Sequence, residues 1–246
     1  MEFSNLPTSL GRLAGLLKSE VDNGQKLNPK RVKEIVLQAD VQEEDLAHYA
    51  DFDHPIEDCY GRKMVLDYGA FEIMVMSWNP RDYSSIHNHG YTQWGVVQVF
   101  GNVHHFIYHD KEGVLDFAKK EILVKGSVVK VNNNLIHQMG NPSSEPYYTL
   151  HVYGSNERTE NVTADAKNYD LEFDRISHTT GGAFLNLPAE EIYDFQEGPT
   201  TSSEVFHHYA YLLLDYYDRQ EASEEIDALR SRLLEKLAEM KTMNLV

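Results

Sequence analysis

Short strand-like runs fill the middle of the chain and restrict its fold more than any other feature. Between Lys63 and about Asp174, runs such as FEIMVMSW, WGVVQVF, VHHFIYH and SVVKV are rich in Val, Ile, Tyr and Phe, with Gly, Asn or Asp between them. This texture is typical of antiparallel strands in a sandwich or barrel. At 246 residues, 41% of them hydrophobic, the chain can bury one sizeable core. The sequence therefore predicts an all-β core formed by one barrel.

Helical patterns precede the strand-rich region. Apolar residues recur at helical spacing after Ser9, and Asn28 followed by Pro29 is a helix-start signal for residues 29–38. A third short helix is expected over residues 43–49. We expect residues 1–58 to form a helical layer packed on a barrel that spans residues 59–175.

The last part of the chain, residues 176–246, is expected to hold an irregular wrap and then C-terminal helices, all within one structural domain. The segment from His178 to Thr201 has little periodic signal and is interpreted as irregular structure without chemistry. Two helical patterns follow Ser202, and Ser223 is a start signal for the second. The second pattern has an apolar stripe formed by Ile226, Leu229, Leu233, Leu237 and Met240. This stripe favours docking on the barrel over pairing with a second subunit.

Composition excludes several classes of partner and site. The formal net charge is −17, so phosphate backbones and anionic lipid surfaces should repel the chain, and neither nucleic acid nor membrane is an expected partner. The single cysteine, Cys59, excludes an internal disulfide and any multi-thiolate metal site, and it is interpreted as a small buried hydrophobe. No signal peptide or membrane-spanning run is evident, so a cytoplasmic protein is expected.

Three histidines stand in two spaced patterns within the strand-rich region. His87 and His89 are two residues apart and would share one face of a strand. After His89 come four residues and then Trp94, and after Trp94 come six residues and then Gly101. In the second pattern, Gly126 precedes His137 by eleven positions. These spacings resemble the two motifs of the cupin fold, a double-stranded β-helix or jelly-roll barrel. Trp94 replaces the usual glutamate of the first motif, and a run of three asparagines replaces the Pro-x-Gly turn of the second.

A site of three neutral imidazoles has a specific chemistry. It leaves the 2+ charge of a metal uncompensated and keeps coordination positions open, which invites an anionic ligand such as a thiolate. Imidazole suits zinc, copper, nickel and iron alike, and a three-histidine zinc site is well suited to activating water. The histidines alone therefore leave the metal open.

A longer stretch, from Tyr60 to Gly154, resembles the cysteine dioxygenase family in the order and spacing of YGR, SWNPRDYSSIHNH, LIHQMGN and TLHVYG. The resemblance implies iron(II) bound by His87, His89 and His137. It also implies that Arg62, aided by Tyr60, binds the substrate carboxylate, a task suited to the planar guanidinium fork.

Three further residues match a hydrogen-bonded relay that the family has beside its metal ligands. Thr149, His151 and Tyr153 stand where the family has a Ser-His-Tyr relay, and strand alternation puts all three on one face. Mammalian-type members have a cysteine, joined to the tyrosine, at the place of Trp94, so this chain resembles the bacterial type, which has no crosslink. Trp94 is expected to be a bulky wall of the substrate pocket if it faces the metal.

The resemblance implies that a small thiol and dioxygen are the partners of a monomer or homodimer, and that L-cysteine is oxidised to cysteine sulfinate. Arg62 favours a carboxylate-bearing thiol, which leaves 3-mercaptopropionate as an alternative. Two other readings remain at this point, a zinc cupin that acts as a hydrolase or isomerase, and a non-catalytic cupin that binds a small acid. The remaining candidate histidines are interpreted as surface or packing residues: His104, His105, His109, His207 and His208.

Overall fold

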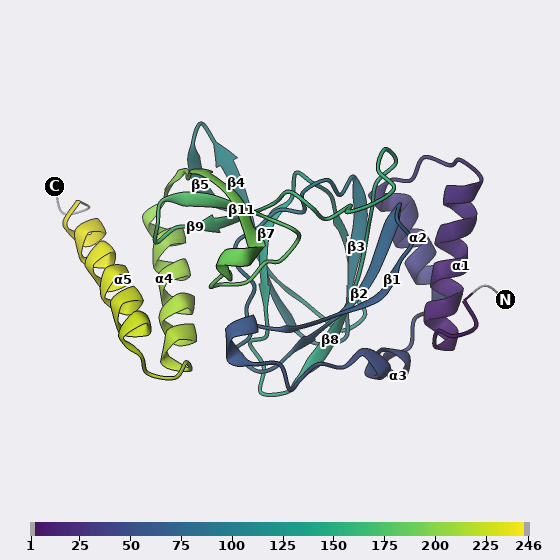
Figure 1. Ribbon diagram of the computed structural model, residues 1–246, viewed down its shortest axis with the longest axis horizontal. Coiled ribbons are helices and arrows are strands. Elements are labelled where there is room, and N and C mark those ends of the chain that lie inside the picture. Colours follow the sequence, from purple (N-terminus) through teal and green to yellow (C-terminus); the bar gives the residue numbers. More distant parts are fainter. Residues whose placement is uncertain (1–2, 244–246) are drawn as a thin grey trace.

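The computed structural model describes residues 3–243, which form two main sheets, a smaller third sheet and helices at both ends (Figure 1). The five-stranded sheet has the order β1 (Gly61–Asp67), β2 (Phe71–Trp78), β8 (Tyr147–Gly154), β3 (Trp94–Val99), β6 (Val128–Val131). The four-stranded sheet has the order β12 (Thr200–Thr201), β5 (Val114–Leu123), β4 (Val103–Lys111), β7 (Ile136–Gly140). The three-stranded sheet has the order β11 (Ile192–Glu197), β10 (Arg175–Thr179), β9 (Ala166–Asp170). The predicted cupin fold, an all-β double-stranded β-helix with flanking helices, is confirmed.

An extended segment between β2 and β3 joins the sheets at the position of the first histidine. His87 forms isolated antiparallel bridges with His137 of β7 and with Asn168 of β9. The backbone N–H of each of His87 and His137 donates to the other's carbonyl at 2.9 Å. His87 and His89 therefore lie in an extended segment rather than in a long strand, and backbone pairing places His87 directly beside His137.

The central strands of the five-stranded sheet are buried on both faces. Every residue of β2 is buried, and in β8 the only residue that is not is Tyr148. Because successive side chains of a strand alternate, Leu150 and Val152 point to the outer face while Thr149 and His151 point to the barrel interior. One strand thus contributes to a packing layer on one side and to a polar site on the other.

Three N-terminal helices cover the outer face of this sheet: α1 (Thr8–Asp22), α2 (Pro29–Ala39) and α3 (Glu43–Leu46), followed by a 3-10 turn (Ala47–Tyr49) (Figure 1). The helix-start signal at Asn28 is confirmed, since its side chain accepts hydrogen bonds from the backbone N–H groups of Lys30 and Arg31 at 3.0 and 3.1 Å. Ser9 lies inside α1, where its hydroxyl donates to Asp45 at 2.7 Å and ties α1 to α3.

Two C-terminal helices lie at the opposite end of the molecule, α4 (Ser203–Asp218) against the barrel and α5 (Glu224–Met243) against α4 (Figure 1). Ser223 accepts a hydrogen bond from the backbone N–H of Ile226 at 3.2 Å, which confirms it as the helix start. Leu233 of the predicted apolar stripe is fully buried in the barrel's core cluster. The stripe therefore docks within this chain, mainly on α4. No described helix is long and apolar enough to cross a membrane.

The prediction of irregular structure from His178 to Thr201 is wrong in part. This segment contains a 3-10 turn (Ala189–Glu191) and the strands β11 and β12, and β11 pairs antiparallel with β10. The aromatic side chains of β11, Tyr193 and Phe195, are exposed, so the strand leaves no buried apolar stripe in the sequence. Backbone pairing with β10 stabilises this strand, and the burial of an apolar stripe does not.

Candidate metal centre

His87, His89 and His137 come together inside the barrel. One ligand nitrogen from each lies within 4.8 Å of the others, and this is the only such cluster of three or more potential metal-binding side chains among the described residues. The ring centroids of His137 lie 4.7 Å from those of both His87 and His89. Three imidazoles at these separations can ligate one ion.

Hydrogen bonds of the rings indicate which nitrogens face the shared space. His87 Nδ1 lies 2.9 Å from the Ser85 carbonyl, an acceptor, so this nitrogen has the proton and Nε2 has the lone pair. His137 Nδ1 lies 2.9 Å from His105 Nε2, which likewise leaves His137 Nε2 for a ligand. Neither ring nitrogen of His89 has a hydrogen bond of normal geometry to any described residue, although both are buried. Buried nitrogens without partners are expected where a ligand supplies the missing interaction.

Burial keeps these imidazoles neutral. It lowers the pKa of His87 to about 4 and holds the pKa values of His89 and His137 well below the usual range, with further lowering at both of the latter from neighbouring histidines. Metal ligation requires the neutral ring. The free Nε2 atoms, the unpartnered His89 and the neutral rings all fit a divalent metal ion.

A chain of hydrogen bonds runs along the inner face of β8 to the cavity. Thr149 Oγ1 lies 2.7 Å from His151 Nε2, and His151 Nδ1 lies 2.6 Å from Tyr153 Oη. Trp78 Nε1 donates to Thr149 Oγ1 at 2.8 Å and extends the chain by one member. With Trp78 donating, the hydroxyl of Thr149 finds its acceptor at His151 Nε2, and His151 then donates to Tyr153. The Tyr153 proton is thereby left for the cavity.

A small cavity of about 30 Å³ joins these groups. Its lining includes the three histidines, His151, Tyr153, Tyr60 and Arg62, and apolar side chains from Met74, Met76, Trp78, Met139, Ala166 and Ala183. Ligand pockets for larger molecules measure roughly 300–1,000 Å³. The cavity therefore suits a ligand of few heavy atoms.

Arg62 and Tyr60 lie at one wall of this cavity. Tyr60 is buried and stacks on Trp78 and Phe184 with ring centroids 4.7 and 5.1 Å away. Arg62 Nε is buried and has no hydrogen-bond partner among the described residues, and no described residue forms an ion pair with the guanidinium. Burial raises the pKa of Glu72 while the nearby Arg62 charge opposes that rise. An arginine with free donors at a cavity wall can bind an anion.

The family model described as cysteine dioxygenase type I matches residues 4–159, well over half of the chain. The chain belongs to the cysteine dioxygenase type I family. Bovine cysteine dioxygenase type 1 is 28% identical over 136 residues, which cover 53% of this chain and 66% of the bovine protein. The human enzyme is 28% identical over 153 residues, which cover 60% of this chain and 74% of the human protein.

Solved structures with barrels of this kind include a double-stranded β-helix protein from Klebsiella pneumoniae, 17% identical with a TM-score of 0.35. That match covers 47% of this chain and 94% of the other. A Cupin 2 barrel domain protein from Salinispora arenicola is 13% identical with a TM-score of 0.32, covering 43% of this chain and 85% of the other.

Within this cysteine dioxygenase family member, the expectation that Trp94 forms a wall of the pocket is wrong. Trp94 is fully buried in the outer core with the N-terminal helices, and its ring covers Gly154. Gly95 is the residue paired with Tyr153 across the sheet, and an added Cβ there would lie 2.9 Å from the Tyr153 ring. The tyrosine thus has glycine, not a bulky side chain, beside it.

Several cavity residues escaped the sequence analysis. Gly181 and Ala183 come from the segment interpreted as free of chemistry, and Thr163 and Ala166 precede it. All four follow the residues that the family model matches, and none stands in a sequence motif that indicates a site. His105, interpreted as a surface or packing residue, is only 2% exposed and contacts His137 directly, which a search for residues opposite His137 in the sheet could have found.

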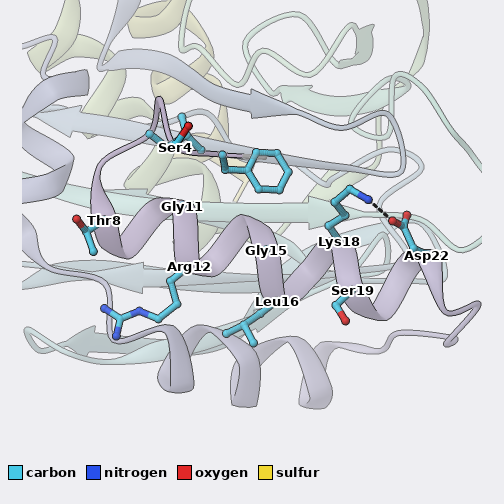
Figure 2. Close-up of a pocket in the computed structure, with 11 residues that line it drawn as sticks. Ser4, Thr8, Gly11, Arg12, Gly15, Leu16, Lys18, Ser19 and Asp22 are labelled. Carbon is cyan, nitrogen blue, oxygen red and sulfur yellow. Dashed lines mark hydrogen bonds and ion pairs between the residues drawn. The ribbon is translucent and has the colours of Figure 1, made fainter. Parts of the chain in front are cut away.

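A much larger hollow lies elsewhere, along the exposed side of α1 (Figure 2). It is open, it has no histidine or cysteine in its lining, and its charged pair is Lys18 with Asp22. Size alone therefore does not locate the chemistry, because the perturbed titratable groups converge on the smaller cavity.

Proposed function

We propose that this protein is an iron(II)-dependent thiol dioxygenase that oxidises a small carboxylate-bearing thiol, foremost L-cysteine, to its sulfinate. In this reaction the thiolate sulfur gives up four electrons, dioxygen accepts them, and both oxygen atoms become bonded to sulfur. The thiol proton is released and no external reductant is consumed. The observation that supports the proposal most is that three neutral histidines and an arginine without an ion-pair partner among the described residues line one small cavity.

Arg62 is proposed to bind the substrate carboxylate. Its Nε has no other acceptor among the described residues, and a charged hydrogen bond to a carboxylate contributes about 1.5–3 kcal/mol. Tyr60, in contact with the same cavity, would orient the guanidinium and the carboxylate. The same two residues suit 3-mercaptopropionate, which has a carboxylate and a thiol but no amine.

His87, His89 and His137 are proposed to hold the iron. When bound, iron(II) supplies a Lewis acid that keeps the sulfur as a thiolate and activates dioxygen. A thiolate also supplies negative charge that the neutral imidazoles do not. This charge balance favours a substrate that binds as a thiolate over one that binds as a neutral ligand.

Tyr153 is proposed to donate a hydrogen bond from its hydroxyl group to the substrate or dioxygen in the cavity. His151 and Thr149 orient it through hydrogen bonds of 2.6 and 2.7 Å, and Trp78 restrains Thr149. Burial raises the pKa of the Tyr153 phenol, so the group stays a donor at neutral pH. A fixed donor aimed at developing charge is the type of interaction that lowers reaction barriers most.

The test is oxygen uptake by protein loaded separately with iron(II) and with zinc, supplied with L-cysteine, 3-mercaptopropionate and cysteamine. The proposal predicts uptake with iron only, and with the two carboxylate-bearing thiols rather than with cysteamine. Absence of uptake with every thiol would refute dioxygenation, and the zinc hydrolase or acid-binding readings would then lead. Oxygen uptake with 3-mercaptopropionate alone would change the assigned substrate from L-cysteine to 3-mercaptopropionate and leave the assigned reaction, thiol dioxygenation, unchanged.

A further inference from the structure

A second hydrogen-bond chain approaches the metal centre from the opposite side of the barrel. His105 Nε2 lies 2.9 Å from His137 Nδ1, and His105 Nδ1 lies 3.0 Å from Glu121 Oε1. The rings of His105 and His137 meet edge to face, at an angle of 88°. The proposed function assigns no role to His105 or Glu121.

Sheet register explains how the three side chains meet. The strands β5, β4 and β7 are consecutive neighbours in the four-stranded sheet, and each contributes one member. Glu121 stands directly opposite His105, while His137 lies diagonally from His105, which pairs with Met139. Directly opposite and diagonal neighbours on one face are within reach of long side chains. The hydrogen bonds therefore run across the sheet from β5 through β4 to β7, with a diagonal step at His137.

The direction of each hydrogen bond follows from the two ends. Glu121 is an acceptor at its carboxylate, so His105 Nδ1 has the proton and His105 Nε2 has the lone pair. His105 Nε2 then accepts the Nδ1 proton of His137. This leaves the His137 Nε2 lone pair directed to the space shared with His87 and His89.

We propose that Glu121 and His105 position His137 as a metal ligand, by fixing its ring orientation and tautomer through a carboxylate–imidazole–imidazole chain. The inference rests on the metal site of the proposed function and is independent of which thiol is oxidised. Carboxylates behind a ligating histidine commonly fix its tautomer, and losing such a partner typically lowers metal affinity about 10–100-fold. Glu121 also supplies negative charge near a site whose ligands have none.

The surroundings of His105 and Glu121 support this positioning role. His105 is 2% exposed, so water can hardly replace His137 and Glu121 as its hydrogen-bond partners. Glu121 is partly exposed, and its second oxygen forms an ion pair with Lys119, whose side chain is largely exposed. Neighbouring His104 makes a different contact, with Tyr83 Oη at 2.8 Å, and serves as a matched control on the same strand.

The experiment is a competition titration of apo protein with Co²⁺, combined with the visible absorption spectrum of the Co²⁺-loaded protein. Four variants are compared with the unaltered chain: His105→Leu, Glu121→Gln, and the controls His104→Leu and Lys119→Gln. We expect His105→Leu to bind Co²⁺ about 10–100-fold more weakly and with shifted absorption bands. Glu121→Gln should show a smaller loss with a shift in the same direction, and both controls should match the unaltered chain.

Unchanged affinity and spectrum in His105→Leu would overturn the inference, as would an equal loss in His104→Leu. If His105→Leu does not fold, Glu121→Gln decides, because its side chain is partly exposed, and an unchanged spectrum there refutes the positioning role. Because the titration uses no thiol, its outcome is separate from that of the oxygen-uptake assay. If the unaltered protein oxidises no thiol while His105→Leu still weakens Co²⁺ binding, the proposed function is refuted and the positioning role stands.

Discussion

The two faces of β8 differ in everything except burial. On the inner face, Thr149, His151 and Tyr153 are linked by hydrogen bonds and reach the metal centre. On the outer face, Leu150 and Val152 pack among the apolar side chains of the N-terminal helices. Burial therefore does not distinguish the candidate site residues of this strand from its packing residues. Hydrogen-bond pairing, or the lack of a partner at a cavity, does.

The comparison also divides the energetics between the faces. Buried polar groups stabilise little even when they are paired, and they cost about 1–3 kcal/mol when a partner is lost. Burial of the apolar side chains on the outer face of β8, Leu150 and Val152, instead contributes favourable transfer free energy. We therefore expect inner-face changes to alter function and outer-face changes to alter stability.

The largest effect is expected for His89→Ala at the inner site. Losing one of three ligands should reduce iron binding and oxygen uptake by more than about 100-fold, beyond the range typical of outer partners. His109→Ala is the control, since His109 is not part of the cluster. Metal analysis after dialysis together with oxygen uptake measures the effect. Full iron binding by His89→Ala would contradict the assigned ligand set.

Leu150→Ala probes the outer face of the same strand. Leu150 is 1% exposed, and a buried Leu→Ala change costs about 2–5 kcal/mol in the free energy of unfolding. Chemical denaturation should show this loss, while kcat at a temperature where the variant is folded should match the unaltered chain. A stable variant with a large loss of kcat would contradict the division between the faces.

Arg62→Met is expected to separate binding from turnover. Loss of a charged hydrogen bond of about 1.5–3 kcal/mol corresponds to a KM roughly 10–100-fold higher for L-cysteine, with a smaller effect on kcat. Lys63→Met is the matched control, since Lys63 is exposed and pairs with Asp51 at 3.2 Å. Steady-state kinetics with the two variants measures the split. An unchanged KM in Arg62→Met would remove its assigned role.

Trp78→Phe and Trp94→Phe compare the faces with one substitution. Trp78 donates to Thr149 on the inner face, whereas Trp94 Nε1 on the outer face has no partner among the described residues. Losing a hydrogen bond of about 1 kcal/mol should lower kcat roughly fivefold in Trp78→Phe. Trp94→Phe should leave kcat unchanged. Equal kcat losses in the two variants would show that the chain of hydrogen bonds does not begin at Trp78.

The sequence predicted the features that follow from local pattern and spacing. Strand alternation put Thr149, His151 and Tyr153 on one face, and a cap signal at Asn28 located the start of α2. The cluster of His87, His89 and His137 was predicted from the H-x-H pair and from the sequence spacing of the second motif, which contains His137. These features depend on neighbours along the chain or on one fixed motif.

The features that escaped prediction depend on register between distant strands. Motif spacing gave Trp94 the place beside the tyrosine, whereas the pairing of β3 with β8 places Gly95 there. His105 became part of the site only because β4 lies between β5 and β7. Ala183 reaches the cavity from a loop that follows β10 and has no periodic signal.

The most direct test of the central account is the fate of the two atoms of dioxygen. Iron-loaded protein is supplied with L-cysteine under ¹⁸O₂ in ordinary water, and the product is analysed by mass spectrometry. The account predicts a sulfinate in which both oxygen atoms bear the label. A product with oxygen from water, or only the disulfide of the thiol, would contradict thiol dioxygenation at the three-histidine site.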